Sequence, residues 1–350
     1  MIVDNGYVHG GDIYRNRVTL DFSANVNPYG TPDPVKAAIR AAADDAARYP
    51  DPYCTALREK LAARHGVSER DILCGNGAAE LIYAFAQALP VKTALLPVPS
   101  FADYESALRA AGIEPTFYPL LREDGFAVTE RILDAITADT ELVMLCSPNN
   151  PTGRSIGREL LLKILARCRE TGAWLFSDEC FEDLCDVEKA VSLAPELKRN
   201  DRVLLLRAFT KTYGMAGVRL GYAISENDAL LSRMSTQTQP WNVSTVAQAA
   251  GLAALDCTDW AARARALFRQ EKAYLIGELR TLSVSTLYGD ANFLLLSGVP
   301  TLYEALLERG ILVRDCQNYR GLQKGDVRIA VRTHPENAAL IAAIREVLHA

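Results

Sequence analysis

The sequence lacks a long hydrophobic run and an excess of basic charge, and we expect no secretory leader. In its 350 residues, no stretch approaches the ~20 uninterrupted apolar residues that span a bilayer. The net charge of −5 and the pI near 5.6 argue against general binding of nucleic acid or of an acidic membrane surface. Residues 1–6 carry neither a basic segment nor an apolar core, so we expect a cytoplasmic protein.

Cysteine and histidine are present, but not in the patterns that form disulfides or bind metals. The eight cysteines show no CxxC spacing, and several lie in apolar runs, as Cys146 does. We interpret them as buried thiols of a protein from a reducing compartment. The four histidines are not paired at helical spacing, so no metal site is predicted.

Strand and helix signals alternate through the middle of the chain. The predicted strands cover residues 71–73, 93–96, 142–146, 173–177 and 203–207, and the predicted helices cover 78–89, 104–111 and 159–171. This alternation predicts an α/β fold with a mostly parallel central sheet flanked by helices. After residue 233, long helices at 245–254 and 260–281 are followed by short strands at 293–296, 312–314 and 327–331 and a helix at 338–348, which predicts a smaller α+β domain.

Three of the predicted strands end at polar side chains of different chemistry. Asn150 lies in the Pro/Gly turn after 142–146, Asp178 ends the strand at 173–177, and Lys211 follows 203–207. Taken singly, these residues are typical of a turn, a helix cap and a surface charge. The carboxyl ends of parallel strands, however, form the ligand crevice of open α/β sheets. An amine, a carboxylate and an amide that meet there are what pyridoxal 5′-phosphate (PLP) requires.

A glycine-rich turn before the helix predicted at 78–89 is a candidate phosphate cradle. Free backbone N–H groups at a helix start can bind a phosphate, here those of Gly77, Ala78 and Ala79. A simple tight turn has the same pattern. Thr210 and Arg219, on either side of Lys211, can complete the cradle. Phe101 is placed to stack on the cofactor ring, or else it is a plain core phenylalanine.

The ordered set of motifs resembles the fold-type-I aminotransferase superfamily, and the resemblance runs essentially end to end. It rests on Gly75-Asn76-Gly77, Pro99-Ser100-Phe101, Asn150-Pro151-Thr152-Gly153, Asp178-Glu179, Lys211 and Arg219-Leu220-Gly221. The resemblance implies that PLP is attached to Lys211, that Asp178 pairs with its pyridine nitrogen, and that Asn150 binds its ring hydroxyl. It also implies that Arg219 binds the cofactor phosphate.

The pattern along the chain also predicts how it is divided. Residues 4–34 are rich in Gly, Asn and Pro, so we expect an extended arm rather than a core element. This N-terminal arm, placed at residues 1–34, is expected to contribute to the small domain and the active site. A large PLP-binding domain over 35–235 and a small C-terminal domain over 236–350 complete the fold. Tyr49 resembles the tyrosine that reaches the cofactor phosphate of a neighbouring subunit, so a homodimer with shared active sites is expected.

Two groups within the superfamily are most similar to this sequence: the threonine-phosphate decarboxylases of cobalamin biosynthesis and the histidinol-phosphate aminotransferases. The decarboxylases are favoured by the N-terminal residues 9–12 and 21–28, by residues 240–244, and by Phe181 in place of a tyrosine. Asp12 and Ala79 depart from the expected pattern. The resemblance implies decarboxylation of an O-phosphorylated amino acid, namely L-threonine O-3-phosphate. Transamination of the histidinol-phosphate type, with 2-oxoglutarate and glutamate, is the alternative.

A substrate that carries both a carboxylate and a phosphate needs more than one cation. Arg328 matches the arginine that clamps the substrate carboxylate, although a structural ion pair has the same appearance. If residues 328–331 form a strand, Arg332 shares a face with Arg328, unless the two are a surface pair. His9 and Asn25, on the arm, are the other candidate substrate ligands, although an arm histidine is often simply solvated. A PLP-sensing regulator without turnover is disfavoured, because the sequence has no basic patch for DNA.

Overall fold

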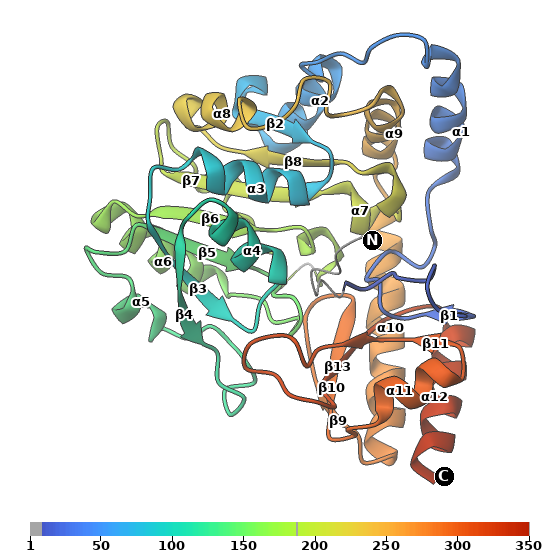
Figure 1. The fold of residues 1–350 in the computed structure, drawn as a ribbon. Coiled ribbons are helices and arrows are strands. Elements are labelled where there is room, and N and C mark those ends of the chain that lie inside the picture. The colour runs from blue at the N-terminus through green and yellow to red at the C-terminus, as the bar shows by residue number, and fades with distance from the viewer. Residues whose placement is uncertain (1–8, 187, 350) are drawn as a thin grey trace, which may run out of the picture.

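The structure, a computed structural model, describes residues 9–186 and 188–349, so residues 1–8 of the predicted arm lie outside the described residues. Figure 1 shows a large sheet between helices, and below it a smaller sheet beside three helices of the C-terminal third. These three are α10 (Trp260–Thr281), α11 (Leu302–Glu308) and α12 (His334–His349). None of the helices in the described part of the chain is long and apolar enough to cross a membrane.

The large sheet has seven strands in the order β2-β8-β7-β6-β5-β3-β4. The strands are β2 (Ile72–Gly75), β3 (Thr93–Val98), β4 (Glu114–Pro119), β5 (Leu142–Cys146), β6 (Trp174–Asp178), β7 (Val203–Ala208) and β8 (Gly221–Ile224). Strand β8 is antiparallel to β2 and β7, and the other pairs are parallel. The predicted mostly parallel sheet is confirmed.

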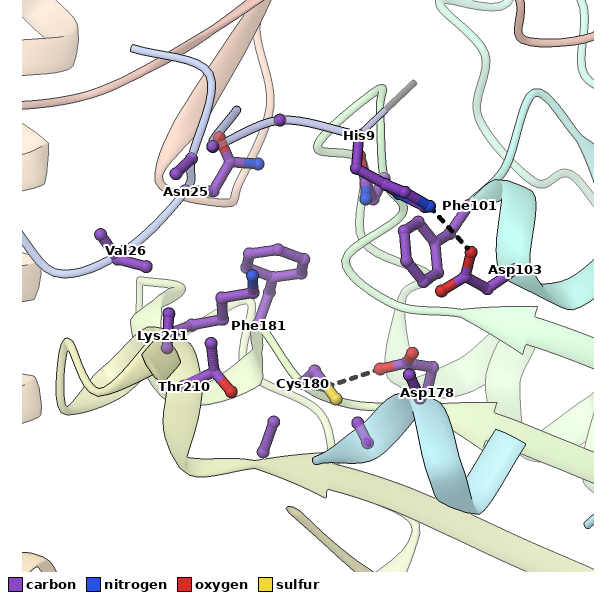
Figure 2. A pocket seen from close by; sticks show the side chains of 18 of the residues that line it. His9, Asn25, Val26, Phe101, Asp103, Asp178, Cys180, Phe181, Thr210 and Lys211 are labelled. Carbon is purple, nitrogen blue, oxygen red and sulfur yellow. Dashed lines mark hydrogen bonds and ion pairs between the residues drawn. The ribbon is translucent and has the colours of Figure 1, made fainter. Parts of the chain in front are cut away.

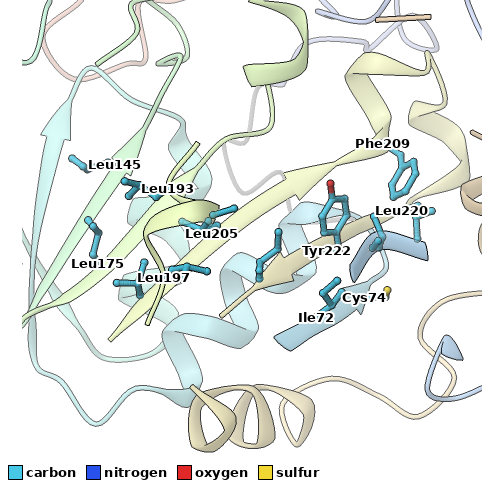
Figure 3. Packing of buried hydrophobic residues seen from close by; sticks show 14 of the residues in the cluster. Ile72, Cys74, Leu145, Leu175, Leu193, Leu197, Leu205, Phe209, Leu220 and Tyr222 are labelled. Carbon is cyan, nitrogen blue, oxygen red and sulfur yellow. The ribbon is translucent and has the colours of Figure 1, made fainter. Parts of the chain in front are cut away.

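The central strands are hydrophobic on both faces, because helices cover both sides of the sheet. Leu175 and Leu205 point into one core, and Phe176 and Leu204 point into the other, as the two-residue period of a strand requires. Figure 3 shows the first core, in which leucines of β5, β6 and β7 lie side by side. It is covered by α2 (Thr55–His65), α5 (Ile132–Ala135), α6 (Arg158–Thr171) and α9 (Thr245–Asp256), and the second by α3 (Ala78–Ala88), α4 (Ala102–Ala110) and α8 (Asp228–Ser235).

The smaller sheet is antiparallel, with the order β12-β13-β10-β9. Its strands are β9 (Ser285–Leu287), β10 (Phe293–Ser297), β12 (Arg314–Asp315) and β13 (Val327–Ala330). A separate pair joins β1 (Leu20–Asp21) to β11 (Ile311–Leu312). The strand predicted at 312–314 is therefore divided between two sheets. The predicted arm is also tied into the fold, because Phe22 is fully buried in the core of this unit.

Helix α9 differs from the predicted division of the chain. It lies within 236–350, the range predicted for the small domain, yet it packs against α2 and α1 (Asp33–Ala42). Its small buried residues, Ala247, Ala250 and Ala254, belong to the core of the large sheet. A boundary at residue 235 therefore does not separate the two packing units.

Candidate active site

A cavity of about 480 Å³ lies at the carboxyl edge of the large sheet. The arm contributes His9 and Asn25 to its wall, and the small sheet contributes Arg314 and Arg328. Figure 2 shows side chains from the arm and from the large sheet directed toward the same space. The lining residues that the sequence predicted are His9, Asn25, Ala78, Ala79, Phe101, Asn150, Asp178, Thr210, Lys211, Arg219 and Arg328.

The three polar strand ends meet because their strands are neighbours in register. Asp178, the last residue of β6, is paired with Cys146 of β5 and Leu206 of β7. The turn after β5 carries Asn150, and the short helix α7 (Phe209–Thr212) after β7 carries Lys211. The amide, the carboxylate and the amine predicted from the sequence therefore line one cavity.

Lys211 is held at the cavity in a form that is easily deprotonated. Burial, and then the positive charge of Arg328, lower the pKa of Lys211 to about 8. The ring of Phe181 lies 5.7 Å from the Lys211 Nζ atom. The arm fixes the backbone of the lysine loop, since the Asn27 N–H donates to the Lys211 carbonyl at 2.9 Å and the Asn27 side chain donates to the Thr212 carbonyl at 2.9 Å.

Gly77 and Arg219 meet at the start of α3, where the sequence predicts a phosphate cradle. Gly77 precedes the helix with φ of +80°, and no side chain caps the free N–H groups behind it. A Cβ atom at Gly77 would overlap the Arg219 guanidinium, with Cζ only 2.8 Å away. Ala78, Ala79 and Thr210 line the same part of the cavity. The arrangement leaves backbone donors and a cation facing a space that any side chain at residue 77 would fill.

Arg328 connects the small sheet to the strand ends. Its guanidinium donates to the Asn150 side-chain oxygen and, at 2.7 Å, to the Ser23 carbonyl. With its amide oxygen turned toward the arginine, Asn25 accepts from Arg328 Nε at 3.1 Å. Burial lowers the pKa of Arg328. The side chain therefore has fixed neighbours on three sides and faces the cavity.

Arg314 is a site residue that sequence reasoning missed. It lines the cavity, is only 3% exposed, and lies across the ladder from Arg328, its partner in the β12–β13 pairing. Its guanidinium contacts neutral side chains, since it donates to Asn318 at 2.9 Å and stacks over Tyr319 at 5.0 Å. A strand of two residues has no periodic pattern in the sequence, so nothing in the sequence indicates that Arg314 is buried at the cavity.

His9 and Phe101 meet at the mouth of the cavity together with a carboxylate that the sequence analysis did not consider. His9 Nε2 lies 3.5 Å from the Asp103 carboxylate, and its ring centroid lies 6.0 Å from that of Phe101 (Figure 2). Burial raises the pKa of Asp103, and the charge of His9 opposes this increase. The arm thus contacts the first turn of α4 across the cavity.

Two predicted site residues lie away from this cavity. Tyr49 is 79% exposed and stacks on Trp241 with a centroid distance of 4.5 Å. Arg332 follows the end of β13, and its guanidinium pairs with Glu336 at 2.7 Å. Its backbone N–H donates to the Asn337 side chain, so Arg332 leads into α12, which begins at His334, rather than continuing the strand. The expected alignment of Arg332 with Arg328 therefore does not form.

The described residues fit PLP. A carbonyl cofactor needs an amine whose pKa is lowered, a phosphate needs the glycine cradle and its arginine, and a pyridine nitrogen needs a buried carboxylate. Lys211, Arg219 and Asp178 supply these groups around one cavity. Phe101 borders the space between them and offers an aromatic face.

The chain is similar in sequence and in structure to known proteins. The family described as "Aminotransferase class I and II" matches residues 17–344. The chain is 39% identical to a threonine-phosphate decarboxylase of Salmonella typhimurium, over 97% of this chain and 96% of the relative. Among solved structures, the histidinol-phosphate aminotransferase of Clostridium acetobutylicum superposes with a TM-score of 0.87 at 27% identity, covering 94% of this chain and 99% of that one. The L-threonine-O-3-phosphate decarboxylase of Porphyromonas gingivalis gives a TM-score of 0.83 at 27% identity, covering 95% and 100%.

Proposed function

This chain belongs to the class I and II aminotransferase family, and we propose that it is a PLP-dependent decarboxylase of an O-phosphorylated amino acid. The proposed substrate is L-threonine O-3-phosphate, and the product is (R)-1-aminopropan-2-yl phosphate, an intermediate of cobalamin biosynthesis. The similarity to threonine-phosphate decarboxylases over nearly the whole chain supports this assignment.

The pair Arg314 and Arg328 is the observation that carries the proposal. Two like charges directly opposite one another on a strand pair destabilise a fold unless an anion lies between or beside them. Both guanidiniums are buried, and in residues 9–186 and 188–349 neither forms an ion pair with a carboxylate. A substrate with two anionic groups would neutralise both arginines together.

The chain's own residues then have separate tasks. When bound, PLP supplies an electron sink for a bond that breaks at the substrate Cα. Arg328, beside Asn150, binds the carboxylate, and Arg314 binds the phosphate with help from His9 and Asn25. These contacts set which Cα bond stands perpendicular to the cofactor ring, and that orientation decides which bond breaks.

Proton transfer falls to Lys211. Once CO₂ has left, the substrate Cα needs a proton in place of the lost carboxylate. A Lys211 amine whose pKa is about 8 is mostly protonated at neutral pH and can give up its proton readily. The same amine can accept a proton from Cα in a transamination, so Lys211 alone does not decide between the two reactions.

Transamination of the histidinol-phosphate type is the second candidate, and the structural similarity to such an aminotransferase favours it. Two assays on the PLP-loaded protein separate the candidates. L-Threonine O-3-phosphate should release CO₂ without any oxo acid, whereas histidinol phosphate with 2-oxoglutarate should give little glutamate. Glutamate formation without CO₂ release from threonine phosphate would reject the decarboxylase.

The protein is further proposed to be a homodimer with shared active sites. Support comes from exposed aromatic side chains, since Tyr49, Tyr53 and Trp241 are 79%, 71% and 45% exposed and Tyr49 stacks on Trp241. Sedimentation should give twice the 38.3 kDa mass of one chain. Mixing a Lys211→Ala chain with a Tyr49→Phe chain tests sharing, because mixed dimers would recover one intact site. A monomeric, fully active protein would reject the assembly.

A cytoplasmic location is proposed on the state of the cysteines. All eight are free thiols, and seven of them are buried. Such thiols are typical of proteins from a reducing compartment. Fractionation of the source cells, with the protein detected by antibody, tests the location, and recovery outside the cytoplasmic fraction would contradict it.

A further inference from the structure

Tyr104 lines the cavity and is in direct contact with the carboxylate of Asp178. It belongs to α4 and is only 1% exposed. Its hydroxyl donates to Asp178 Oδ2 at 2.7 Å. Burial and the nearby Asp178 charge raise the pKa of Tyr104, so the phenol keeps its proton and acts as the donor.

The second oxygen of Asp178 is also engaged. Asp178 Oδ1 accepts from the Cys180 backbone N–H at 2.8 Å (Figure 2). Two donors from different elements thus fix the rotation of the carboxylate. Burial raises the pKa of Asp178, whereas the hydrogen bonds from Cys180 and Tyr104 lower it. The ionised form of this buried group therefore depends on the donors behind it.

Aromatic packing holds Tyr104 in place independently of its hydroxyl. Its ring meets Phe101 edge-on at 5.7 Å and 82°, and meets Phe176 at 5.9 Å and 67°. These contacts require only the ring. A phenylalanine at position 104 would keep them and remove the hydroxyl, with its hydrogen bond to Asp178 and its contact with the Cys146 thiol.

We propose that Tyr104 is a positioning residue that keeps Asp178 ionised and turned toward the cofactor, so that the pyridine nitrogen of bound PLP holds a proton. The proposal rests on the proposed function only in that PLP binds at this cavity. A hydrogen bond to a charged acceptor is worth a factor of roughly 10 to 100 in an ionisation equilibrium. Loss of the Tyr104 hydroxyl would make Asp178 more basic, and the shared proton would move from the nitrogen to the carboxylate.

The direct test is ¹⁵N NMR of the protein loaded with PLP that is labelled at the pyridine nitrogen. In the wild type the signal should have the position of a protonated nitrogen, and in Tyr104→Phe it should move toward that of a neutral pyridine. Tyr222→Phe is the matched control, since Tyr222 is also buried and shares a 2.9 Å hydrogen bond with His65. The control should leave the nitrogen signal unchanged. An unchanged signal in Tyr104→Phe would overturn the proposal, even if that variant were less stable or less active.

A double variant shows whether Tyr104 acts through Asp178. In an Asp178→Asn background, Tyr104→Phe should cause no additional shift of the nitrogen signal, and an equal shift in both backgrounds would overturn the proposal. Should Tyr104→Phe fail to fold, 3-fluorotyrosine at position 104 keeps the ring and the hydroxyl but donates more strongly. The wild-type nitrogen is already expected to be protonated, so this variant should keep the signal at the protonated position, and movement toward the neutral position would count against the role. A wild type that binds no PLP would instead reject the proposed function.

Discussion

Arg314 and Arg328 face one another across the β12–β13 ladder, and both guanidiniums line the cavity that contains Lys211. The pairing explains why the site suits an anion-rich substrate. Arg328 also donates to Asn150 and lowers the pKa of Lys211, so its replacement affects the proposed cofactor residues as well. Replacement of Arg314 is therefore the more specific test of the proposed substrate contact.

Replacement of Arg314 should weaken selection for the phosphate. Arg314→Gln should lower kcat/KM for L-threonine O-3-phosphate by about 10- to 100-fold, the value of a hydrogen bond to a charged group. Activity toward non-phosphorylated L-threonine should change much less. Steady-state kinetics on both substrates measures the ratio, and an equal loss on the two would contradict a phosphate contact.

Arg332→Gln is the natural companion to that experiment. Arg332 was expected from the sequence to bind the phosphate, but it pairs with Glu336 at the start of α12. Because the ion pair lies outside the cavity, the variant should alter the selectivity ratio less than Arg314→Gln does. A larger change in the selectivity ratio of Arg332→Gln than in that of Arg314→Gln would show that Arg332 binds the phosphate.

Lys211→Ala should remove covalent attachment of the cofactor. The wild-type protein with PLP should show visible absorbance and a cofactor that borohydride fixes to the chain, and the variant should show neither. Lys60→Ala is the control, since Lys60 pairs with Asp256 at a distance from the cavity. Mass spectrometry of the reduced protein locates the attachment, and cofactor fixed to any other lysine would show that Lys211 is misassigned.

The pH dependence of PLP uptake should report the amine of Lys211. Only the neutral amine attacks a carbonyl, so the uptake rate of the apoprotein should rise through a pKa of about 8 and then level off. Arg328→Met removes a cation that lowers this pKa, so the rise should move to higher pH and uptake at pH 7 should slow. Stopped-flow absorbance measures both profiles. A shift of the uptake profile to lower pH in Arg328→Met would contradict this electrostatic effect of Arg328 on Lys211.

The cradle can be tested through its glycine. Gly77→Ala places a Cβ against the Arg219 guanidinium at a residue with φ of +80°, so PLP affinity should fall by about 10-fold or more. Gly217→Ala is the control, because a Cβ there meets nothing within 4 Å. Equilibrium dialysis of PLP against both variants gives the comparison. Equal affinities would show that the phosphate is held elsewhere.

The parts of this protein that follow from sequence are those set by local pattern. Long apolar runs predicted β5, β6 and β7, and parallel pairing brings their carboxyl ends to one edge, so Asn150, Asp178 and Lys211 meet as expected. The family resemblance and the mostly parallel fold are confirmed. In each case a strong local signal agreed with the global fold.

The parts that could not be predicted depend on contacts between distant segments. Arg314 faces Arg328 only because a two-residue strand joins a sheet, and Arg332 leaves that sheet because Glu336 and Asn337 start a helix there. The bond from Tyr104 to Asp178 joins residues 74 positions apart. Helix α9 packs in the core of the large sheet, because its small apolar residues fit against α1 and α2. No periodicity in the sequence contains this information.

One measurement tests the central claim most directly: the fate of L-threonine O-3-phosphate labelled with ¹³C at its carboxyl carbon, incubated with the PLP-loaded protein in D₂O and followed by NMR. If Arg314 and Arg328 orient the substrate for decarboxylation, the label should appear as ¹³CO₂ and bicarbonate. The aminopropanyl phosphate should carry one deuterium at its former Cα. Deuterium at Cα of a substrate that keeps its ¹³C carboxylate, with no labelled CO₂, would show that the Cα–H bond breaks instead and would contradict the account.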